Sequence, residues 1–221
     1  MFCIITPVFD EAFISVKWLI QDLKEQTFGN FKHIFISNGK SGIIEEVINE
    51  AEDSRFIYVE RPYEPTPKIK DVLINIAHRR NYAIDNFPAE RYFFFDADLL
   101  ITAKNFLEVI ASVHDKADVI LSKVAWIYNE LPIWPIRLGH IDIANYSFSK
   151  KVADLYEYPT DYDCEKGIAN DWRFYEKMIN ESHYINDMVY AKKDGRNCYR
   201  NLTTRYSEEV RKGLHDGPRP K

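Results

Sequence analysis

The stretch RYFFFDADLL, residues 91–100, places a run of apolar side chains directly before two aspartates, Asp96 and Asp98. An unbroken apolar run is typical of a strand that is buried on both faces of a parallel sheet. The aspartates lie at positions i and i+2, so at the end of a strand both carboxylates can reach one ion. Two neighbouring carboxylates repel each other unless a cation or a hydrogen-bond donor meets them. We therefore predict a central strand that ends at a ligand-binding edge.

Paired carboxylates of this kind suit a hard divalent ion, Mg²⁺ or Mn²⁺, whose remaining ligands would be diphosphate oxygens. The same pair could instead cap the next helix or occupy a turn, and an isolated Asp-x-Asp is more often of that kind. The rest of the chain decides between a metal site and a helix cap or turn.

Strands and helices alternate regularly over the first half of the chain. Apolar runs predict strands at residues 2–6, 33–37, 56–59, 92–95 and 118–122. Between them, apolar side chains recur with helical spacing after residues 11, 44, 69 and 105. This order predicts an α/β fold with a mostly parallel sheet that is flanked by helices on both sides.

The pattern changes after about Lys123, where the chain becomes rich in aromatic residues and prolines and predicts irregular strands and loops. A helix is expected around residues 171–179, and residues 215–221 are expected to form a disordered tail. The 221 residues fit a single domain.

Composition restricts the class of protein. A net charge of −5 argues against a nucleic-acid or membrane-surface binder, since either would need a broad basic face. The sequence contains neither an apolar stretch long enough to span a membrane nor a signal peptide at its start. The cysteines, Cys3, Cys164 and Cys198, are odd in number and far apart, which predicts a reducing, cytoplasmic location.

Ligands of open parallel sheets bind beyond the carboxyl ends of the strands. Three predicted strands end on groups of polar residues, at 6–11, 37–39 and 96–98. Four stretches around this edge, ITPVFDEA (5–12), FISNGKSG (35–42), RRNYAI (79–84) and FFFDADLL (93–100), resemble in order and spacing the motifs of the family 2 inverting glycosyltransferases. The resemblance covers roughly residues 2–122 and is looser beyond them.

This resemblance implies the GT-A fold, which is Rossmann-like and binds nucleoside-diphosphate sugars. One domain would occupy residues 1–214, with a nucleotide-sugar-binding half at 1–122 and an acceptor-binding half at 123–214. Arg80 would approach the base or diphosphate, Asp96 the ribose, and Asp98 the metal ion that bridges the diphosphate. The implied site for a UDP- or GDP-sugar consists of Thr6, Pro7, Phe9, Glu11, Asn38, Arg80, Asp96, Ala97 and Asp98, with Thr6, Phe9 and Glu11 around the base and ribose.

Two features depart from the family pattern. Asn38 stands where the family usually has an aspartate for the base edge, which leaves a preference for uracil open. The proline-rich segment 61–68 and the helix before Arg79 exceed the usual short loop, and they either reshape the donor pocket or lie on the surface.

An inverting transfer needs a base that accepts the proton of the acceptor hydroxyl. The resemblance places it at Asp171, in the triplet Asn170-Asp171-Trp172, although an aspartate there could simply stabilise the start of a helix. Trp172 could stack on a sugar or lie in the core. His215 could complete the metal site, as in some GT-A enzymes, or be a solvated residue of the tail.

Further candidates lie on the expected acceptor side. His140 and Asp142 could contact the acceptor or serve the structure, and Trp126, Tyr128 and Trp134 could form a sugar platform or pack on one another. The chain has neither the Gln-x-x-Arg-Trp motif nor the membrane helices of the processive synthases in this family. We therefore expect an enzyme that adds one sugar, or a module of a larger glycosyltransferase.

The leading hypothesis is a metal-dependent inverting glycosyltransferase that moves one sugar to a hydroxyl of a glycan or another acceptor. A sugar-phosphate nucleotidyltransferase is a second hypothesis, but such enzymes usually carry a glycine-rich, basic loop after the first strand, and ITPVFDEA has neither glycine nor a basic residue. An inactive domain that binds sugar nucleotides or glycans is the third, and Asn38 is its only support.

Overall fold

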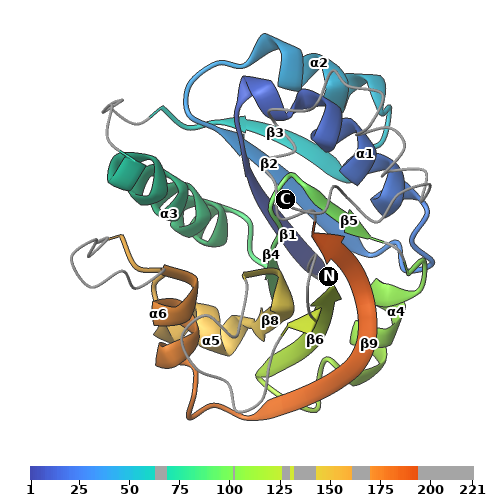
Figure 1. The fold of residues 1–221 in the computed structure, drawn as a ribbon, viewed down its shortest axis with the longest axis vertical. Helices are drawn as coiled ribbons and strands as arrows, with labels where there is room; N and C mark the ends of the chain where they lie inside the picture. The colour runs from blue at the N-terminus through green and yellow to red at the C-terminus, as the bar shows by residue number, and fades with distance from the viewer. Residues whose placement is uncertain (63–68, 102, 126–129, 132–142, 161–169, 194–221) are drawn as a thin grey trace, which may run out of the picture.

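The protein is described by a computed structural model, which places residues 1–62, 69–101, 103–125, 130–131, 143–160 and 170–193 (Figure 1). Within these ranges, one sheet of nine strands has the order β3-β2-β1-β4-β8-β6-β9-β5, with β7 beside β6. The strands are β1 (Phe2–Val8), β2 (Phe31–Ser37), β3 (Phe56–Glu60), β4 (Arg91–Phe94), β5 (Leu99–Ile101), β6 (Val119–Ala125), β7 (Glu130–Leu131), β8 (Tyr146–Ser149) and β9 (His183–Lys193).

The half of the sheet built from the first four strands is parallel. β1 pairs in parallel with both β2 and β4, and β2 pairs in parallel with β3. Every residue of β1 and of β4 is buried. The apolar run before the two aspartates is therefore a central strand, as predicted, and the α/β fold is confirmed.

The other half of the sheet is mixed. β8 lies between β4 and β6 and is antiparallel to both. β9 is parallel to β6 and antiparallel to β5. The predicted strand at 118–122 is present as β6, but the sequence did not reveal that a strand from the aromatic-rich stretch separates it from β4. At four residues, β8 is too short for its alternation to stand out from its surroundings.

Helices cover both faces of the sheet (Figure 1). The buried cluster on one face contains residues of α1 (Phe13–Lys24), α2 (Gly42–Glu50) and α4 (Phe106–Val113). The cluster on the other face contains residues of α3 (Ile69–Asn86), α5 (Lys150–Leu155) and α6 (Asn170–Lys177). No helix in the described ranges is long and apolar enough to cross a membrane.

Arg91 ties the middle of the sheet together although it is a charged residue at the start of a buried strand. Its guanidinium donates hydrogen bonds to the carbonyl oxygens of His114 (2.7 Å), Ala117 (2.6 Å) and Ser147 (3.2 Å). These bonds join β4 to the turn after α4 and to β8. A buried charge is tolerated here because several carbonyl dipoles solvate it.

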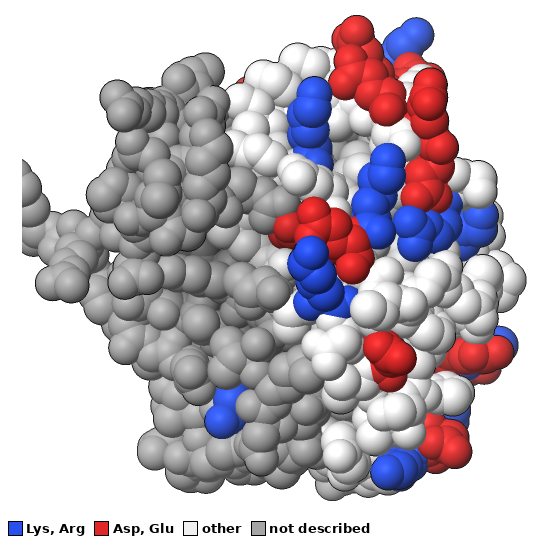
Figure 2. Space-filling model, turned by 90° about the vertical axis from the view of Figure 1, so that its right-hand side faces the viewer, with Lys and Arg blue, Asp and Glu red and all other residues white. Residues whose placement is uncertain are grey.

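The surface of the described part carries both signs of charge. Figure 2 shows Lys and Arg side chains standing among Asp and Glu side chains on one face of the molecule. Ion pairs such as Lys17–Glu50 (3.4 Å) and Lys104–Glu25 (3.0 Å) are exposed and contribute little to stability.

Candidate active site

The two aspartates of the DAD sequence lie where β4 leaves the sheet. The backbone turns at Asp96, whose carbonyl oxygen accepts a hydrogen bond from the amide of Leu99 (3.1 Å) at the start of β5. The Asp96 side chain is 32% exposed, Ala97 is buried, and Asp98 is 9% exposed. The predicted carboxylate pair therefore lies at the carboxyl end of a rigid central strand.

Arg80 on α3 connects Asp96 to a residue from the far part of the chain. Its side chain is 4% exposed, and Nη2 donates to Asp96 Oδ1 at 3.1 Å. Nη1 lies 3.6 Å from Asp171 Oδ1, so one guanidinium contacts both carboxylates. The guanidinium also lies over the rings of Phe94 (5.1 Å) and Tyr158 (5.0 Å). Cation–π contacts of this kind stabilise a desolvated arginine.

Tyr158 completes this cluster and was not predicted from the sequence. Its buried hydroxyl accepts a hydrogen bond from Arg80 Nη1 (2.8 Å) and donates one to Asp171 Oδ1 (2.6 Å). Burial and the neighbouring charge of Asp171 raise the pKa of Tyr158 well above its usual value, so the hydroxyl keeps its proton and acts as a donor. No local pattern pointed to Tyr158, because its contact with Arg80 spans 78 positions.

Asn81 fixes the backbone of Tyr158. The Asn81 amide nitrogen donates to the carbonyl oxygen of Tyr158 (2.9 Å), and the amide of Tyr158 donates to Asn81 Oδ1 (2.9 Å). Arg80 and Asn81 thus hold the same tyrosine, one through the hydroxyl and one through the backbone. The Arg-Asn pair lies well inside the 18-residue helix α3 and not at its start.

The charge of Arg80 is secured by its surroundings. Burial alone would lower the pKa of Arg80, but Tyr158, Asp96 and Asp171 outweigh it and raise the pKa. We expected Arg80 to approach the nucleotide base or diphosphate. The structure places its guanidinium on the two carboxylates and the tyrosine, where it orients Asp96 and Asp171.

Asp171 lies in the first turn of α6 and its side chain is 31% exposed. The carbonyl oxygen of Asp171 accepts a hydrogen bond from the Tyr146 hydroxyl (3.2 Å). Its carboxylate is therefore not only a negative charge at the start of a helix, since Tyr158 and Arg80 hold one of its oxygens in place. Trp172 is partly buried, packs on the core of this face and lies next to Tyr175 (6.1 Å between ring centroids).

The other residues predicted for the donor, at the ends of β1, β2 and β4, fall into an exposed and a buried group. Phe9, Glu11 and Asn38 are exposed. The Thr6 side chain is fully buried, and its hydroxyl lies 2.8 Å from His33 Nε2. Pro7 and Ala97 are also buried. Thr6 shares its face of β1 with Ile4 and Val8, which pack toward α1 and α2, because strand side chains alternate.

The loop after β2 is held by its own hydrogen bonds. Gly39 has φ of +85°, a conformation that favours glycine. The Tyr58 hydroxyl accepts from the amide of Ser41 (2.7 Å) and lies 2.8 Å from the Ser37 hydroxyl. Ser41 in turn donates to the carboxylate of Asp10, which joins the loops after β1 and β2. Asn38 thus stands on a well-supported turn.

Solved structures resemble this fold. TarS from S. aureus in complex with UDP superposes with a TM-score of 0.68 at 17% identity, over 87% of this chain and 60% of TarS 1-349. The mannosyltransferase PcManGT from Pyrobaculum calidifontis, in complex with GDP-Man and Mn²⁺, superposes with a TM-score of 0.63 at 14% identity, over 97% of this chain and 61% of that one. The fold is that of the GT-A glycosyltransferases.

The likeness to GT-A proteins is one of structure. No family model matches the sequence, and no curated protein matches it at a significant level. The chain spans about 60% of the length of these two GT-A structures. A third comparison, TarS in complex with UDP-GlcNAc, has a TM-score of 0.67 at 17% identity and covers 89% of this chain and 59% of that one.

The metal site of this GT-A fold was predicted at Asp96, Asp98 and His215. Across the described ranges, no group of three His, Cys, Asp or Glu side chains could hold an ion. Two carboxylates nevertheless fit a Mg²⁺-like ion, because such an ion is commonly held by one or two carboxylates and completes its shell with substrate phosphates and water.

Several predicted residues lie outside the described residues. They are His215, the acceptor-side pair His140 and Asp142, and the aromatic residues Trp126, Tyr128 and Trp134. Cys164 and Cys198 also lie outside, whereas Cys3 is a free, buried thiol.

Proposed function

We propose that this chain is a metal-dependent inverting glycosyltransferase that moves one sugar from a nucleoside-diphosphate sugar to a hydroxyl acceptor, a glycan or another alcohol. The observation that supports it most is the Arg80 cluster. It joins a carboxylate at the end of β4 to Asp171, which lies 75 positions further along the chain (171 − 96). A single-displacement transfer needs the metal site of the donor and the general base for the acceptor close to each other.

On the donor side, Asp98, with Asp96, would hold a Mn²⁺ or Mg²⁺ ion and the diphosphate. A divalent ion there would neutralise the charge that develops on the departing nucleoside diphosphate. The similar structures are complexes with UDP, UDP-GlcNAc, and GDP-Man with Mn²⁺. Exposed Phe9, Glu11 and Asn38 stand at the same edge of the sheet, where a nucleoside would contact them.

On the acceptor side, Asp171 would act as the general base. The acceptor oxygen forms a bond to the anomeric carbon while the bond from that carbon to the diphosphate oxygen breaks, and the hydroxyl proton passes to the Asp171 carboxylate. Attack opposite the leaving group inverts the anomeric configuration. Tyr158 and Arg80 would keep the carboxylate in the orientation that receives the proton.

The other two hypotheses gain no support from the described residues. The loop after β1 still offers no glycine-rich, basic segment for a nucleotidyltransferase. An inactive binding domain would have no use for a carboxylate that is held by a buried arginine and tyrosine. The acceptor, the cytoplasmic location and the role as a module of a larger protein stay predictions.

The donor assignment can be tested by thermal unfolding with nucleoside diphosphates. We expect UDP or GDP to raise the Tm of the wild-type protein by several degrees in the presence of Mn²⁺ and much less without it, because a ligand stabilises the state that binds it. Asp98→Asn should lose the Mn²⁺-dependent part of the shift, and Asp115→Asn, an exposed aspartate after α4, should keep it. Equal shifts in wild type and Asp98→Asn would remove Asp98 from the donor site.

A further inference from the structure

Three arginines are buried in the described part of the chain: Arg79, Arg80 and Arg91. Two of them have partners that account for their burial. Arg91 donates to several carbonyl oxygens, and Arg80 contacts Asp96, Asp171 and Tyr158. Each of these two guanidinium groups is therefore solvated by the protein itself.

Arg79 differs from both. It is 5% exposed, and its Nε atom is buried with no hydrogen-bond partner, as are those of Arg80 and Arg91, but the rest of its guanidinium also makes no hydrogen bond or ion pair within the described residues. Among the described residues, the charge that shifts its pKa is the like charge of Arg80. Burial, followed by that repulsion, lowers the pKa of Arg79 to about 10. A buried charge without a counter-ion is costly, and such costs are typical of binding sites.

Arg79 lines a cavity of about 230 Å³. Arg61, His78, Asn81, Asp85 and Glu157 contribute to the same wall, and the Arg61 guanidinium stacks on the ring of Tyr82 at 4.9 Å. The lining includes none of the strand-end residues predicted for the donor. The cavity is thus lined by a different set of residues from those predicted for the donor, Asp96 and Asp98 among them.

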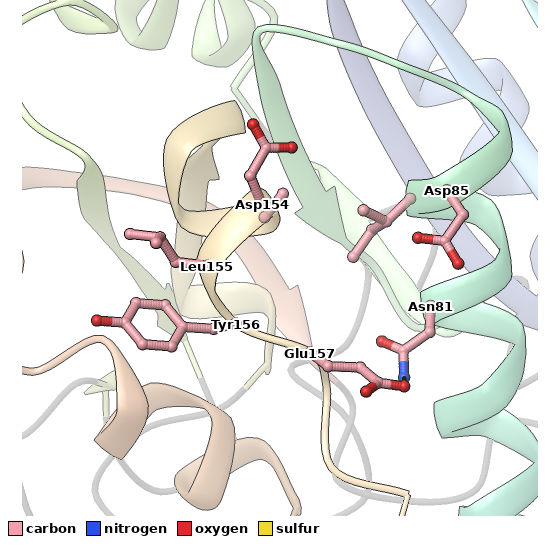
Figure 3. Close-up of a pocket in the computed structure, with 8 residues that line it drawn as sticks. Asn81, Asp85, Asp154, Leu155, Tyr156 and Glu157 are labelled. Atoms are coloured by element: carbon pink, nitrogen blue, oxygen red, sulfur yellow. Dashed lines mark hydrogen bonds between the residues drawn. The ribbon is translucent and has the colours of Figure 1, made fainter.

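A second cavity of about 400 Å³ adjoins it and shares Asn81, Asp85 and Glu157 with it. Figure 3 shows this second cavity, with Asn81 and Asp85 extending from α3 toward the segment from Asp154 to Glu157 on the opposite wall. Asn81 Nδ2 donates to Glu157 Oε1 at 3.1 Å across the gap. The two cavities together offer room for more than a single anion.

We propose that the cavity at Arg79, the Arg79 pocket, binds a phosphate group, with Arg79 and Arg61 as its cationic partners. Planar guanidinium groups match phosphate oxygens bidentately. The carboxylates of Asp85 and Glu157 are exposed, so solvent screens them, whereas the Arg79 charge is desolvated and dominates the inner wall. Asn81, Asp85 and Glu157 are suited to sugar hydroxyls, so a phosphorylated sugar fits both cavities.

This proposal does not depend on the glycosyltransferase activity, because its test measures phosphate binding and not transfer. The change is Arg79→Met, which keeps an unbranched side chain and removes the charge. Thermal unfolding is followed against inorganic phosphate at constant ionic strength. We expect a saturable rise in Tm of several degrees in the wild type that Arg79→Met lacks. The general stabilising effect of phosphate salts acts on both proteins, so the difference between their Tm values measures binding in the pocket.

Arg91→Met is the matched control for loss of a buried arginine. Without phosphate, Arg79→Met should unfold at the same or a higher Tm than the wild type, since an uncompensated charge has gone, whereas Arg91→Met should unfold at a clearly lower Tm. If Arg79→Met lowers the Tm as much as Arg91→Met, Arg79 has a structural role and the proposal is overturned. The same holds if phosphate raises the Tm of the wild type and of Arg79→Met equally, or of neither.

Two further measurements show which phosphate compound binds and whether the Arg79 pocket is separate from the proposed donor site. The quantity compared is the ligand concentration that gives half of the rise in Tm. A lower concentration for glucose 6-phosphate than for inorganic phosphate supports the proposal and identifies a phosphorylated sugar as the ligand. Equal concentrations support the proposal and identify phosphate alone as the ligand. Asp98→Asn should keep the full phosphate-dependent rise. Loss of the rise in Asp98→Asn would overturn the proposal of a separate site.

Discussion

Asp171→Asn is expected to lower kcat for transfer by about a thousandfold while donor binding stays unchanged, since a positioned general base contributes about 10²–10⁴-fold. Asparagine has nearly the same shape and can still accept the hydrogen bond from Tyr158. It cannot accept the proton of the attacking hydroxyl. The measurement is the release of nucleoside diphosphate from UDP- and GDP-sugars with Mn²⁺ and without an acceptor, where water takes the place of the acceptor hydroxyl and gives its proton to the same base.

Asp115→Asn is the matched control for this loss, because Asp115 is exposed and lies in the turn that Arg91 joins to the start of β4, whereas Asp96 and Asp98 follow its carboxyl end. Its turnover should equal that of the wild type. Turnover of Asp171→Asn within tenfold of the wild type would exclude Asp171 as the base and leave it the role of stabilising the start of α6.

Arg80→Met is expected to lower the free energy of unfolding by about 3 kcal/mol, the lower end of the range for breaking a buried ion pair, because both carboxylates are about one-third exposed. The substitution leaves Asp96 and Asp171 near each other without a shared cation. It also removes the stacking on Phe94 and Tyr158. Urea unfolding at neutral pH measures the change.

Two further variants show which contact of Arg80 accounts for the loss of stability. Tyr158→Phe keeps the ring and removes only the hydroxyl, so it should lower the free energy of unfolding by less than Arg80→Met does. Arg79→Met changes the residue before Arg80 on the same helix and should not lower the free energy of unfolding. If Arg80→Met were as stable as the wild type, the cluster would not hold the site together.

Local patterns were enough to predict the framework that carries the site. The apolar run at 92–95 is a buried strand, and the spacing of Val16, Leu19, Ile20 and Leu23 is the buried face of α1. Both signals depend on neighbours within a few residues. The end of β4 followed from its apolar run to within one residue, and so did the placing of Asp96 and Asp98, whereas β1 continues through Pro7 to Val8, two residues beyond the end predicted at Thr6.

Contacts between distant segments could not be predicted in this way. Tyr158 occupies an unremarkable position in the sequence, and only the fold brings it to Arg80 and Asp171. The burial of Arg79 and Arg91 was also hidden, because a charged residue normally indicates the surface. For Thr6, the resemblance suggested a contact with the nucleotide, but the alternation of β1 turns its side chain into the core.

The central claim is that the carboxylates after β4 bind the metal and diphosphate of a donor beside Asp171. Anomalous diffraction from crystals grown with Mn²⁺ and UDP or GDP tests it most directly. We predict an anomalous peak within about 2.5 Å of an Asp98 oxygen and in contact with the diphosphate, at the edge of the sheet where Asp171 also lies. A nucleotide bound with Mn²⁺ away from Asp96 and Asp98 would contradict it.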